Sequence, residues 1–266
     1  MTNSKSWTAM TFNLRVNVTS DGGNAWPHRK HLAADSILGS EAHLIGTQEG
    51  TAGMLEDLDA CLAGYSRIGS GRLGEAEAKL HNDEYCAIYY NREALTLISH
   101  GQFWLSETPD VRGSLGWDSS YPRICTWGCF ENKEVPGMRF YAFNTHFDHL
   151  GQQAREESAK LLLERIRARR EEENCPVLLM GDLNAEPDNS AIRLLREQLQ
   201  DAYTLVDGPV GRTFHDFEGG IDGEPIDYIF ATPDIEMLQT TVDRERHDGA
   251  YPSDHYPVTL AWRYKG

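Results

Sequence analysis

The stretch PVLLMGDLN, residues 176–184, joins an apolar run to a polar end and so limits what this part of the chain can fold into. Five apolar residues in a row without alternation are typical of a buried strand. Asp182 and Asn184 follow where that strand must end. A carboxylate and an amide at this point have two explanations. They form a turn and a helix cap, which both residue types favour, or they belong to a functional site.

The rest of the chain is predicted to contain many strands, joined mostly by short turns, and few helices. Helices are expected at 28–40, 51–63, 152–170 and 188–197. Strands are expected at 8–14, 43–48, 84–91, 94–105, 122–131, 138–145, 176–180, 226–231, 235–243 and 257–263. Segment 70–83 has no periodicity and is expected to be a mobile loop. This count predicts an α/β protein of two packed sheets with helices outside, and we assign residues 1–266 to one domain.

The charge of the chain limits its partners. A net charge of −16 repels nucleic-acid backbones and anionic membranes at long range, although a metal ion could still hold phosphate locally. No apolar stretch approaches the ~18 residues that span a bilayer, and the N-terminus lacks the apolar centre of a signal peptide. We therefore expect a cytoplasmic protein that binds no membrane. The five cysteines are expected to be free thiols, and no feature indicates an obligate protein partner.

Acids, amides and imidazoles stand at the ends of six predicted strands. They are Asn13, Gln48 and Glu49, Asn144 and His146, Asp182 and Asn184, Asp227, and Asp254 and His255. Each of them alone is explained at least as well by a turn or a cap. Strand ends of a layered fold converge on one rim, so their recurrence predicts a polar site there.

These residues lie in short motifs that occur in a fixed order over nearly the whole chain. The motifs are TFNLR (11–15), QE (48–49), NTH (144–146), GDLN (181–184), IDYIF (226–230) and SDH (253–255). The ordered set resembles the endonuclease/exonuclease/phosphatase superfamily. The resemblance implies a four-layer αββα sandwich, with two mostly antiparallel sheets packed face to face, and a metal-dependent phosphoesterase site at one rim. DGGNAWPHRK (21–30) and FWLSETP (103–109) are similar to a bacterial branch near the deadenylase-like and sugar-phosphatase members.

The expected cofactor is Mg²⁺, with Mn²⁺ as an alternative, because hard cations take oxygen ligands. Glu49 is the natural carboxylate ligand, and Asn13 supplies a neutral oxygen beside it. The resemblance assigns both residues to the metal, and Asp254 is a candidate for a second or shared position. Arg15 stands where the apurinic endonucleases carry an acid, so this chain has one carboxylate fewer at that position.

The remaining motif residues are expected to act on water and phosphate. Asp182 is predicted to orient and deprotonate the attacking water, and Asn184 to donate its amide to the phosphate. His146 and His255 are predicted to donate hydrogen bonds to phosphate oxygens from opposite sides. Asp227 is predicted to hold His255 in one tautomer and to raise its basicity.

Four further residues are candidate substrate contacts. Arg123 could hold a phosphate or pair with a surface acid, and Asp148 could line the pocket or begin the following helix. Tyr85 and Trp104 are equally well explained as packing residues of their strands. Folding could also gather arginines around the site, and the candidates are Arg15, Arg72, Arg112 and Arg123.

Several functions share this residue set. The preferred hypothesis is Mg²⁺-dependent hydrolysis of a small soluble phosphate ester, because the net charge disfavours nucleic acid. A 3'–5' exonuclease or deadenylase-like nuclease is the alternative. NTHFDH (144–149) also matches part of a metallo-β-lactamase zinc motif, at His146, Asp148 and His149 but not at Asn144. A binding module that has lost catalysis is the remaining alternative.

Overall fold

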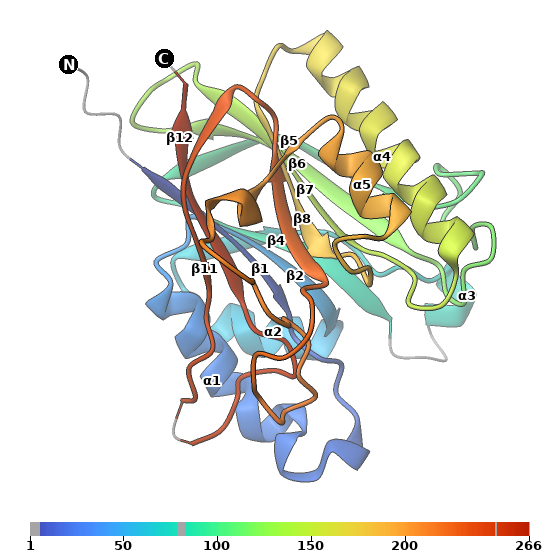
Figure 1. The fold of residues 1–266 in the computed structure, drawn as a ribbon, viewed down its shortest axis with the longest axis vertical. Coiled ribbons are helices and arrows are strands. Elements are labelled where there is room, and N and C mark those ends of the chain that lie inside the picture. Colours follow the sequence, from blue (N-terminus) through green and yellow to red (C-terminus); the bar gives the residue numbers. More distant parts are fainter. Residues whose placement is uncertain (1–5, 79–82, 248, 266) are drawn as a thin grey trace.

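The computed structural model describes residues 6–78, 83–247 and 249–265 and contains two six-stranded mixed sheets (Figure 1). The first sheet has the order β11 (Ile235–Val242), β12 (Val258–Tyr264), β1 (Trp7–Asn13), β2 (Leu44–Thr51), β4 (Glu84–Asn91), β3 (Tyr65–Ile68). The second sheet has the order β5 (Leu95–Trp104), β6 (Ile124–Asn132), β7 (Arg139–His146), β8 (Val177–Asp182), β10 (Asp227–Ala231), β9 (Gln200–Asp201). Of these strands, the short edge strands β3 and β9 were not predicted from the sequence.

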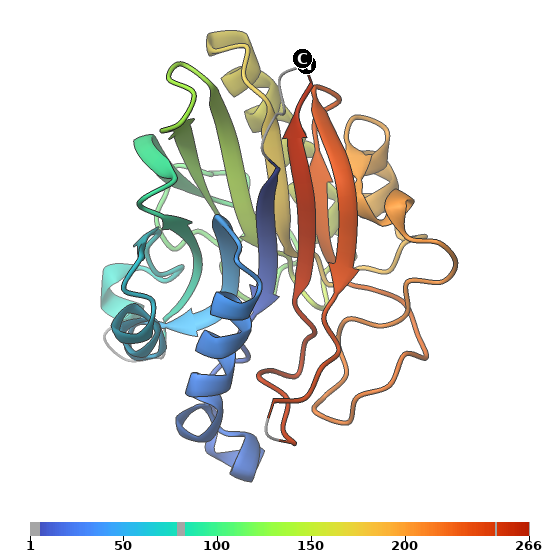
Figure 2. The same ribbon diagram turned by 90° about the vertical axis from the view of Figure 1, so that its left-hand side faces the viewer.

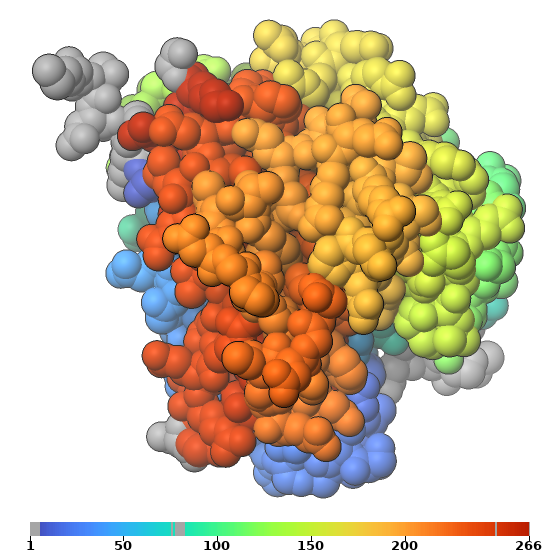
Figure 3. Space-filling view, viewed as in Figure 1, coloured from blue at the N-terminus to red at the C-terminus, as the bar shows by residue number. Residues whose placement is uncertain are grey.

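Helices cover the outer faces of both sheets, which confirms the predicted sandwich (Figure 1). Helices α1 (Trp26–Gly39) and α2 (Ala52–Cys61) pack on the first sheet, and α4 (Gln152–Glu172) and α5 (Ser190–Arg196) pack on the second. In the turned view, β1, β12 and β11 run side by side with α1 in front of the first sheet (Figure 2). Figure 3 shows α4 in yellow-green beside the orange segment that follows β8, on one face of the molecule.

Segment 70–83 contains more regular structure than the sequence predicted. Gly71 forms a β-bridge with Tyr85, and a one-turn helix, α3 (Glu75–Ala78), follows. Residues 79–82 lie outside the described residues, and the prediction of mobility remains untested. The short 3-10 helices η1 (Thr19–Asn24) and η2 (Ala202–Leu205) were not predicted either. None of the helices in the described residues is both long enough and apolar enough to span a membrane.

The side-chain alternation of β8 explains why its sequence is apolar throughout. Val177 and Leu179 pack in the cluster beneath α4 and α5, whereas Leu178 and Met180 pack in the cluster between the two sheets. A strand covered on both faces has no polar face, so alternation disappears from its sequence. The predicted burial of residues 176–180 therefore reflects the position of β8 inside its sheet.

One parallel strand pair in each sheet sets the direction of the central strands. β1 and β2 pair in parallel through α1, and β7 and β8 pair in parallel through α4, while the remaining ladders are antiparallel. A helical crossover is what a parallel pair requires. Because paired parallel strands end at the same edge, β1, β2, β7 and β8 all direct their carboxyl ends to one rim.

Two buried side-chain amides connect the sheets close to this rim. Gln48 Nε2 donates to Asn144 Oδ1 at 2.6 Å, and Asn144 Nδ2 donates to the backbone oxygens of Thr47 and Ala87 at 2.9 and 2.8 Å. Both amides are fully buried. Buried polar groups are costly unless they are paired, so these bonds favour one relative position of the two sheets.

Gly46 lies opposite this amide pair and leaves no room for a side chain. A Cβ at residue 46 would lie 2.6 Å from Asn144 Oδ1 and 2.7 Å from Met180 Sδ. We expect Gly46→Ala to lower the free energy of unfolding by ~1–3 kcal/mol, because overpacking forces neighbours out of place. Gly53→Ala is the control, because its Cβ would meet nothing within 4 Å in α2 and the substitution should be neutral or slightly stabilising. Urea unfolding of both variants tests this, and equal stabilities would contradict it.

Candidate active site

Three neighbouring strands of each sheet deliver polar side chains to the common rim. In the first sheet these are Asn13 at the end of β1, Glu49 in β2, and Asp254 and His255 just before β12. In the second sheet these are His146 at the end of β7, Asp182 at the end of β8 and Asp227 at the start of β10. Asp182 is the register partner of both His146 and Asp227. The structure thus brings together the residues that the sequence motifs predicted.

Asn13 joins two carboxylates that come from different sheets. Its Nδ2 donates to Glu49 Oε1 and to Asp182 Oδ2, both at 2.9 Å. Its Oδ1 accepts from the backbone N–H of Arg15 at 2.9 Å. The other oxygen of Glu49 accepts from the Val16 N–H at 2.8 Å. Both carboxylates are therefore held in fixed orientations by donors of β1 and the residues that follow it.

The backbone is strained at three positions around these carboxylates. Arg15, Glu49 and Asn184 have φ values of 54°, 61° and 46°, in the left-handed region that non-glycine residues seldom adopt. The conformation of Asn184 lets its N–H donate to Asp182 Oδ1 at 2.9 Å while its side-chain amide reaches His146 Nε2 at 2.9 Å. Strain of this kind is commonly stored at functional sites.

The two histidines of the rim have opposite electrostatic surroundings. His255 Nδ1 lies 2.9 Å from Asp227 Oδ2. Burial opposes protonation, but the charge and hydrogen bond of Asp227, together with the charges of Asp182 and Asp254, outweigh burial and raise the pKa of His255 well above its ordinary value. For His146, burial and the charges of Arg123 and Arg72 lower the pKa well below its ordinary value. His255 is therefore an imidazolium near neutral pH, whereas His146 is neutral.

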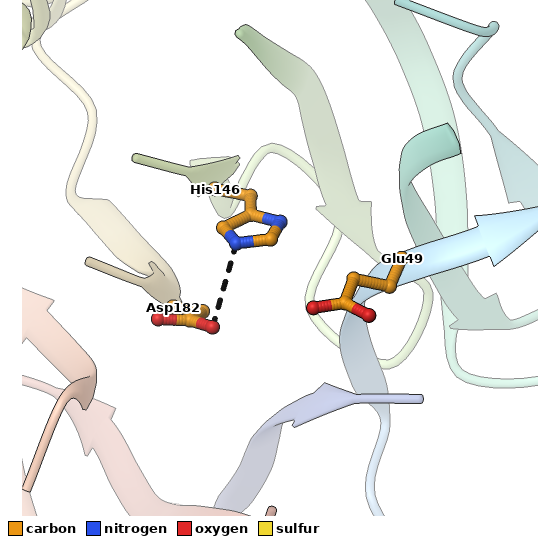
Figure 4. Close-up of side chains that lie close together, drawn as sticks. All are labelled: Glu49, His146 and Asp182. Atoms are coloured by element: carbon orange, nitrogen blue, oxygen red, sulfur yellow. Dashed lines mark ion pairs between the residues drawn. The ribbon is translucent and has the colours of Figure 1, made fainter. Parts of the chain in front are cut away.

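The donor set fits a divalent cation. One ligand atom each of Glu49, His146 and Asp182 lies within 4.8 Å of the others, and the three side chains point toward one another (Figure 4). His146 Nε2 is 3.5 Å from Asp182 Oδ2. Asp254, which lines the same cavity, has its Oδ2 3.6 Å from Arg15 Nε. Oxygen-rich sites without thiolate select hard cations, and a cation would compensate carboxylates that the fold forces together.

A cavity of about 950 Å³, called here the main cavity, opens above these residues. Its walls include the following predicted site residues: Glu49, Arg123, His146, Asp182, Asn184, Asp254 and His255. Asn13 and Asp227 lie behind this layer and act on it through Glu49, Asp182 and His255. A second hollow of about 610 Å³, between α4 and α5, contains none of the motif residues.

Three of the predicted substrate contacts lie outside the main cavity. Trp104 is buried, and its Nε1 donates to the backbone oxygen of Arg72 at 2.7 Å, so it packs beneath the wall. Tyr85 is half-buried and lines only a small recess beside the cavity. Asp148 is fully buried and accepts from the N–H groups of Ser120, Leu150 and Gly151 at 3.0, 3.0 and 2.8 Å.

Asp148 instead anchors Arg123. Its Oδ1 lies 3.4 Å from Arg123 Nε; burial opposes ionisation, but the three N–H donors and Arg123 outweigh it and lower the pKa of Asp148 to about 2. His149 is exposed and accepts from Arg123 Nη2 at 3.1 Å. Within the described residues, His146, Asp148 and His149 do not form a common metal-ligand cluster. The geometry therefore gives no support to the zinc-hydrolase alternative.

Sequence reasoning did not identify several residues of the cavity wall. Arg15 and Arg72 line the cavity and were predicted only as arginines that folding could gather there, whereas Arg112 does not line it. Tyr121 and Phe214 are large exposed side chains on the wall, and the Phe214 ring lies 5.1 Å from the His255 ring. No motif or periodicity marks either aromatic residue, because both lie in irregular loops.

Comparison with solved structures gives matches over almost the whole chain. An endonuclease/exonuclease/phosphatase family protein from Bacteroides thetaiotaomicron is 32% identical, with a TM-score of 0.90 and coverage of 99% of this chain and 96% of that one. A mannosyl-6-phosphatase from the same species is 32% identical, with a TM-score of 0.89 and coverage of 97% and 100%. The human Nocturnin catalytic domain, 20% identical, has a TM-score of 0.76 and coverage of 98% and 95%, and shares the fold. The comparison with curated protein sequences gave no match.

The layered fold and the carboxylate, amide and imidazole groups at its rim define a metal-dependent phosphoesterase. The profile of the endonuclease/exonuclease/phosphatase family matches residues 10–255. The chain belongs to this family, as its motifs predicted.

The raised pKa of Asp182 predicts how stability depends on pH. Burial, together with the nearby Asp227 charge, raises the pKa of Asp182 from 3.8 to about 7. Between these values the folded state holds a proton that the unfolded chain releases, so the free energy of unfolding falls as pH rises. His255 acts in the same direction above its unfolded pKa of about 6.5, because its folded pKa is raised.

The free energy of unfolding of Asp182→Asn and of the wild type is measured in urea, with a chelator present, between pH 4 and 7. We expect this free energy to change less with pH in Asp182→Asn, and the variant to be the more stable protein at pH 7. Asn cannot ionise, so it removes the cost of a buried charge. The control is Asp188→Asn, an exposed residue of the loop that follows β8, which should follow the wild-type profile. A wild-type slope for Asp182→Asn would show that Asp182 is ionised throughout.

Proposed function

We propose that the protein hydrolyses small, soluble phosphate esters with Mg²⁺, or alternatively Mn²⁺, by in-line attack of a water that Asp182 activates. The observation that carries this proposal is the position of Asp182. Its Oδ2 lies 3.8 Å from His255 Nε2 and 3.5 Å from His146 Nε2, at the floor of the main cavity. A carboxylate held by amide donors and facing two imidazoles can take a proton from water while the imidazoles contact phosphate.

Glu49, with Asp254 beside it, would hold the metal ion, whereas Asn13 would position Glu49 through its Nδ2, because its Oδ1 accepts from the Arg15 N–H. When bound, a divalent cation neutralises charge on the phosphate oxygens and strengthens the electrophilic character of phosphorus. This role suits Glu49. Burial opposes its ionisation, but the donors Asn13 and Val16, together with the charges of His255 and Arg15, outweigh burial and lower its pKa. The carboxylate is therefore ionised and preorganised at neutral pH.

The remaining steps of the reaction are assigned to individual side chains. Asp182 accepts the proton of the water as its oxygen bonds to phosphorus and the bond to the ester oxygen breaks. His255, charged through Asp227, donates a hydrogen bond to a phosphate oxygen. Asn184 Nδ2 contacts His146 Nε2 and donates to the Phe147 oxygen, so Asn184 orients neutral His146, which contacts the phosphate from the other side. One water is consumed, with one of its hydrogens on the product phosphate and the other on the alcohol.

The substrate is proposed to be small, with a sugar phosphate or nucleotide-like compound preferred over nucleic acid. The volume of the main cavity, about 950 Å³, is at the upper end of the range for small-molecule sites. The net charge of −16 opposes a long polyanion. The 32% identical mannosyl-6-phosphatase supports a phosphorylated sugar. The gathering of Arg15, Arg72 and Arg123 favours the second candidate, a deadenylase-like nuclease.

Activity is expected to require added Mg²⁺ or Mn²⁺ and to disappear with chelator, because the proposed ligands are oxygens that bind such ions weakly. Glu49→Gln should move the metal-activation curve to higher metal concentration, since an amide is a poorer ligand than a carboxylate. Glu56→Gln, an exposed residue of α2, should leave the curve unchanged. Full activity in excess chelator, with no metal retained by elemental analysis, would contradict the mechanism.

A substrate panel tests the proposed specificity. The values of kcat/KM are compared for a phosphorylated sugar, a mononucleotide, an oligoadenylate and plasmid DNA at matched magnesium and salt. We expect a small ester to be fastest, and Asp182→Ala to lower its kcat by at least ~100-fold, the usual effect of removing a positioned base or charge-stabilising group. Faster cleavage of oligoadenylate or plasmid, with a steep fall as salt rises, would instead favour the nuclease.

A further inference from the structure

A small recess opens beside the metal-binding residues. Its volume is about 10 Å³, close to the least that holds one water molecule. The recess is lined by Glu49, Arg72, Glu84, Tyr85, Cys86, Arg123, Ile124 and His146. Because Glu49, Arg72 and His146 also line the main cavity, the recess adjoins the position proposed for the reacting phosphate.

Two arginines of the recess are buried with donors left free. Arg72 and Arg123 are 8% and 5% exposed. Arg72 Nε and Arg123 Nη1 have no hydrogen-bond partner among the described residues. Each arginine is fixed at another atom, since Arg72 Nη2 donates to Glu84 Oε1 at 2.8 Å and Arg123 Nε lies 3.4 Å from Asp148 Oδ1. Buried donors without partners are costly, so both arginines favour an acceptor placed beside them.

A single aromatic ring covers both guanidinium groups. Their central carbon atoms lie 5.0 Å (Arg72) and 6.0 Å (Arg123) from the centroid of the Tyr121 ring. The ring limits access of water to the arginines, which strengthens their attraction for an anion. Both arginines also line the main cavity, as His146 does, so their charges lie beside the position proposed for the phosphate.

We propose that this recess binds one terminal oxygen of the substrate phosphate and thereby makes the protein a phosphate monoesterase. This inference rests on the proposed function and adds the class of ester. A phosphate monoester has three terminal oxygens, so one can enter the recess while others meet the metal and the histidines. A diester has only two terminal oxygens, because its second ester oxygen carries a carbon chain. A recess of about 10 Å³ has room for one oxygen and no room for that carbon chain.

The test compares two esters with the same leaving group, p-nitrophenyl phosphate and bis(p-nitrophenyl) phosphate, at saturating Mg²⁺. We expect the wild type to have the higher kcat/KM for the monoester. Arg123→Ala should lower the monoester value by ~100-fold or more, as for other charge-stabilising donors, and the diester value by less than ~10-fold. A wild type that prefers the diester, or an equal loss on both esters, would overturn the inference.

Arg72→Lys is the second variant, because lysine keeps the positive charge next to Glu84 but lacks the free Nε–H. It should also lose monoester activity selectively, and thermal melting shows whether each variant is folded. Arg193→Ala, an exposed arginine of α5, is the matched control and should behave as the wild type. An equal loss on both esters in folded Arg72→Lys would contradict a role for its Nε–H.

A binding measurement distinguishes two cases: an error in this inference and an error in the proposed function. Isothermal titration calorimetry with inorganic phosphate and with dimethyl phosphate needs no turnover. The wild type should bind phosphate more tightly, and Arg123→Ala should remove that preference. If neither p-nitrophenyl ester is hydrolysed but the preference is present, the proposed reaction is wrong and the recess remains an anion site. If dimethyl phosphate binds as tightly as phosphate, the recess does not select monoesters, whatever the activity.

Discussion

The hydrogen bond between Gln48 and Asn144 is the contact on which the geometry of the rim depends, because each sheet carries only part of the site. Glu49 follows Gln48 in the first sheet, and His146 stands two residues after Asn144 in the second. A shift of one sheet against the other would break this buried bond and separate the two groups. The Asn13 bridge between Glu49 and Asp182 is a second side-chain link between the two sheets.

The site combines groups that would repel one another without partners. Asp182 and Asp227 face His255, and the two buried arginines face neutral His146. Burial makes each of these charges costly, and the network of donors decides which groups remain ionised. Strained backbone at Arg15, Glu49 and Asn184 adds to this cost. The apolar clusters above and below the strands stabilise the fold and offset the energetic cost of this site.

Much of the fold was predictable because its sheets are covered on both faces. The apolar run 176–180 identified an inner strand, and the helices at 28–40 and 152–170 lie within two residues of α1 and α4 at each end. The edge strands β3 and β9 were missed, since four and two residues carry too little pattern. Family motifs identified the carboxylates, amides and histidines, because those residue types follow directly from the chemistry of metal and phosphate.

The sequence by itself determined the residue types at the rim and the layered fold that gathers them, since both follow from local pattern and motif order. Only the tertiary structure decided their states. His146 and His255 are the same residue type, and their opposite charge states arise from neighbours distant in sequence. Asp148 supports Arg123 instead of lining the cavity, and Arg72 joins Arg123 from the segment between β3 and β4 of the first sheet. Electrostatic environment and enclosed volume depend on contacts between sheets, which no local pattern records.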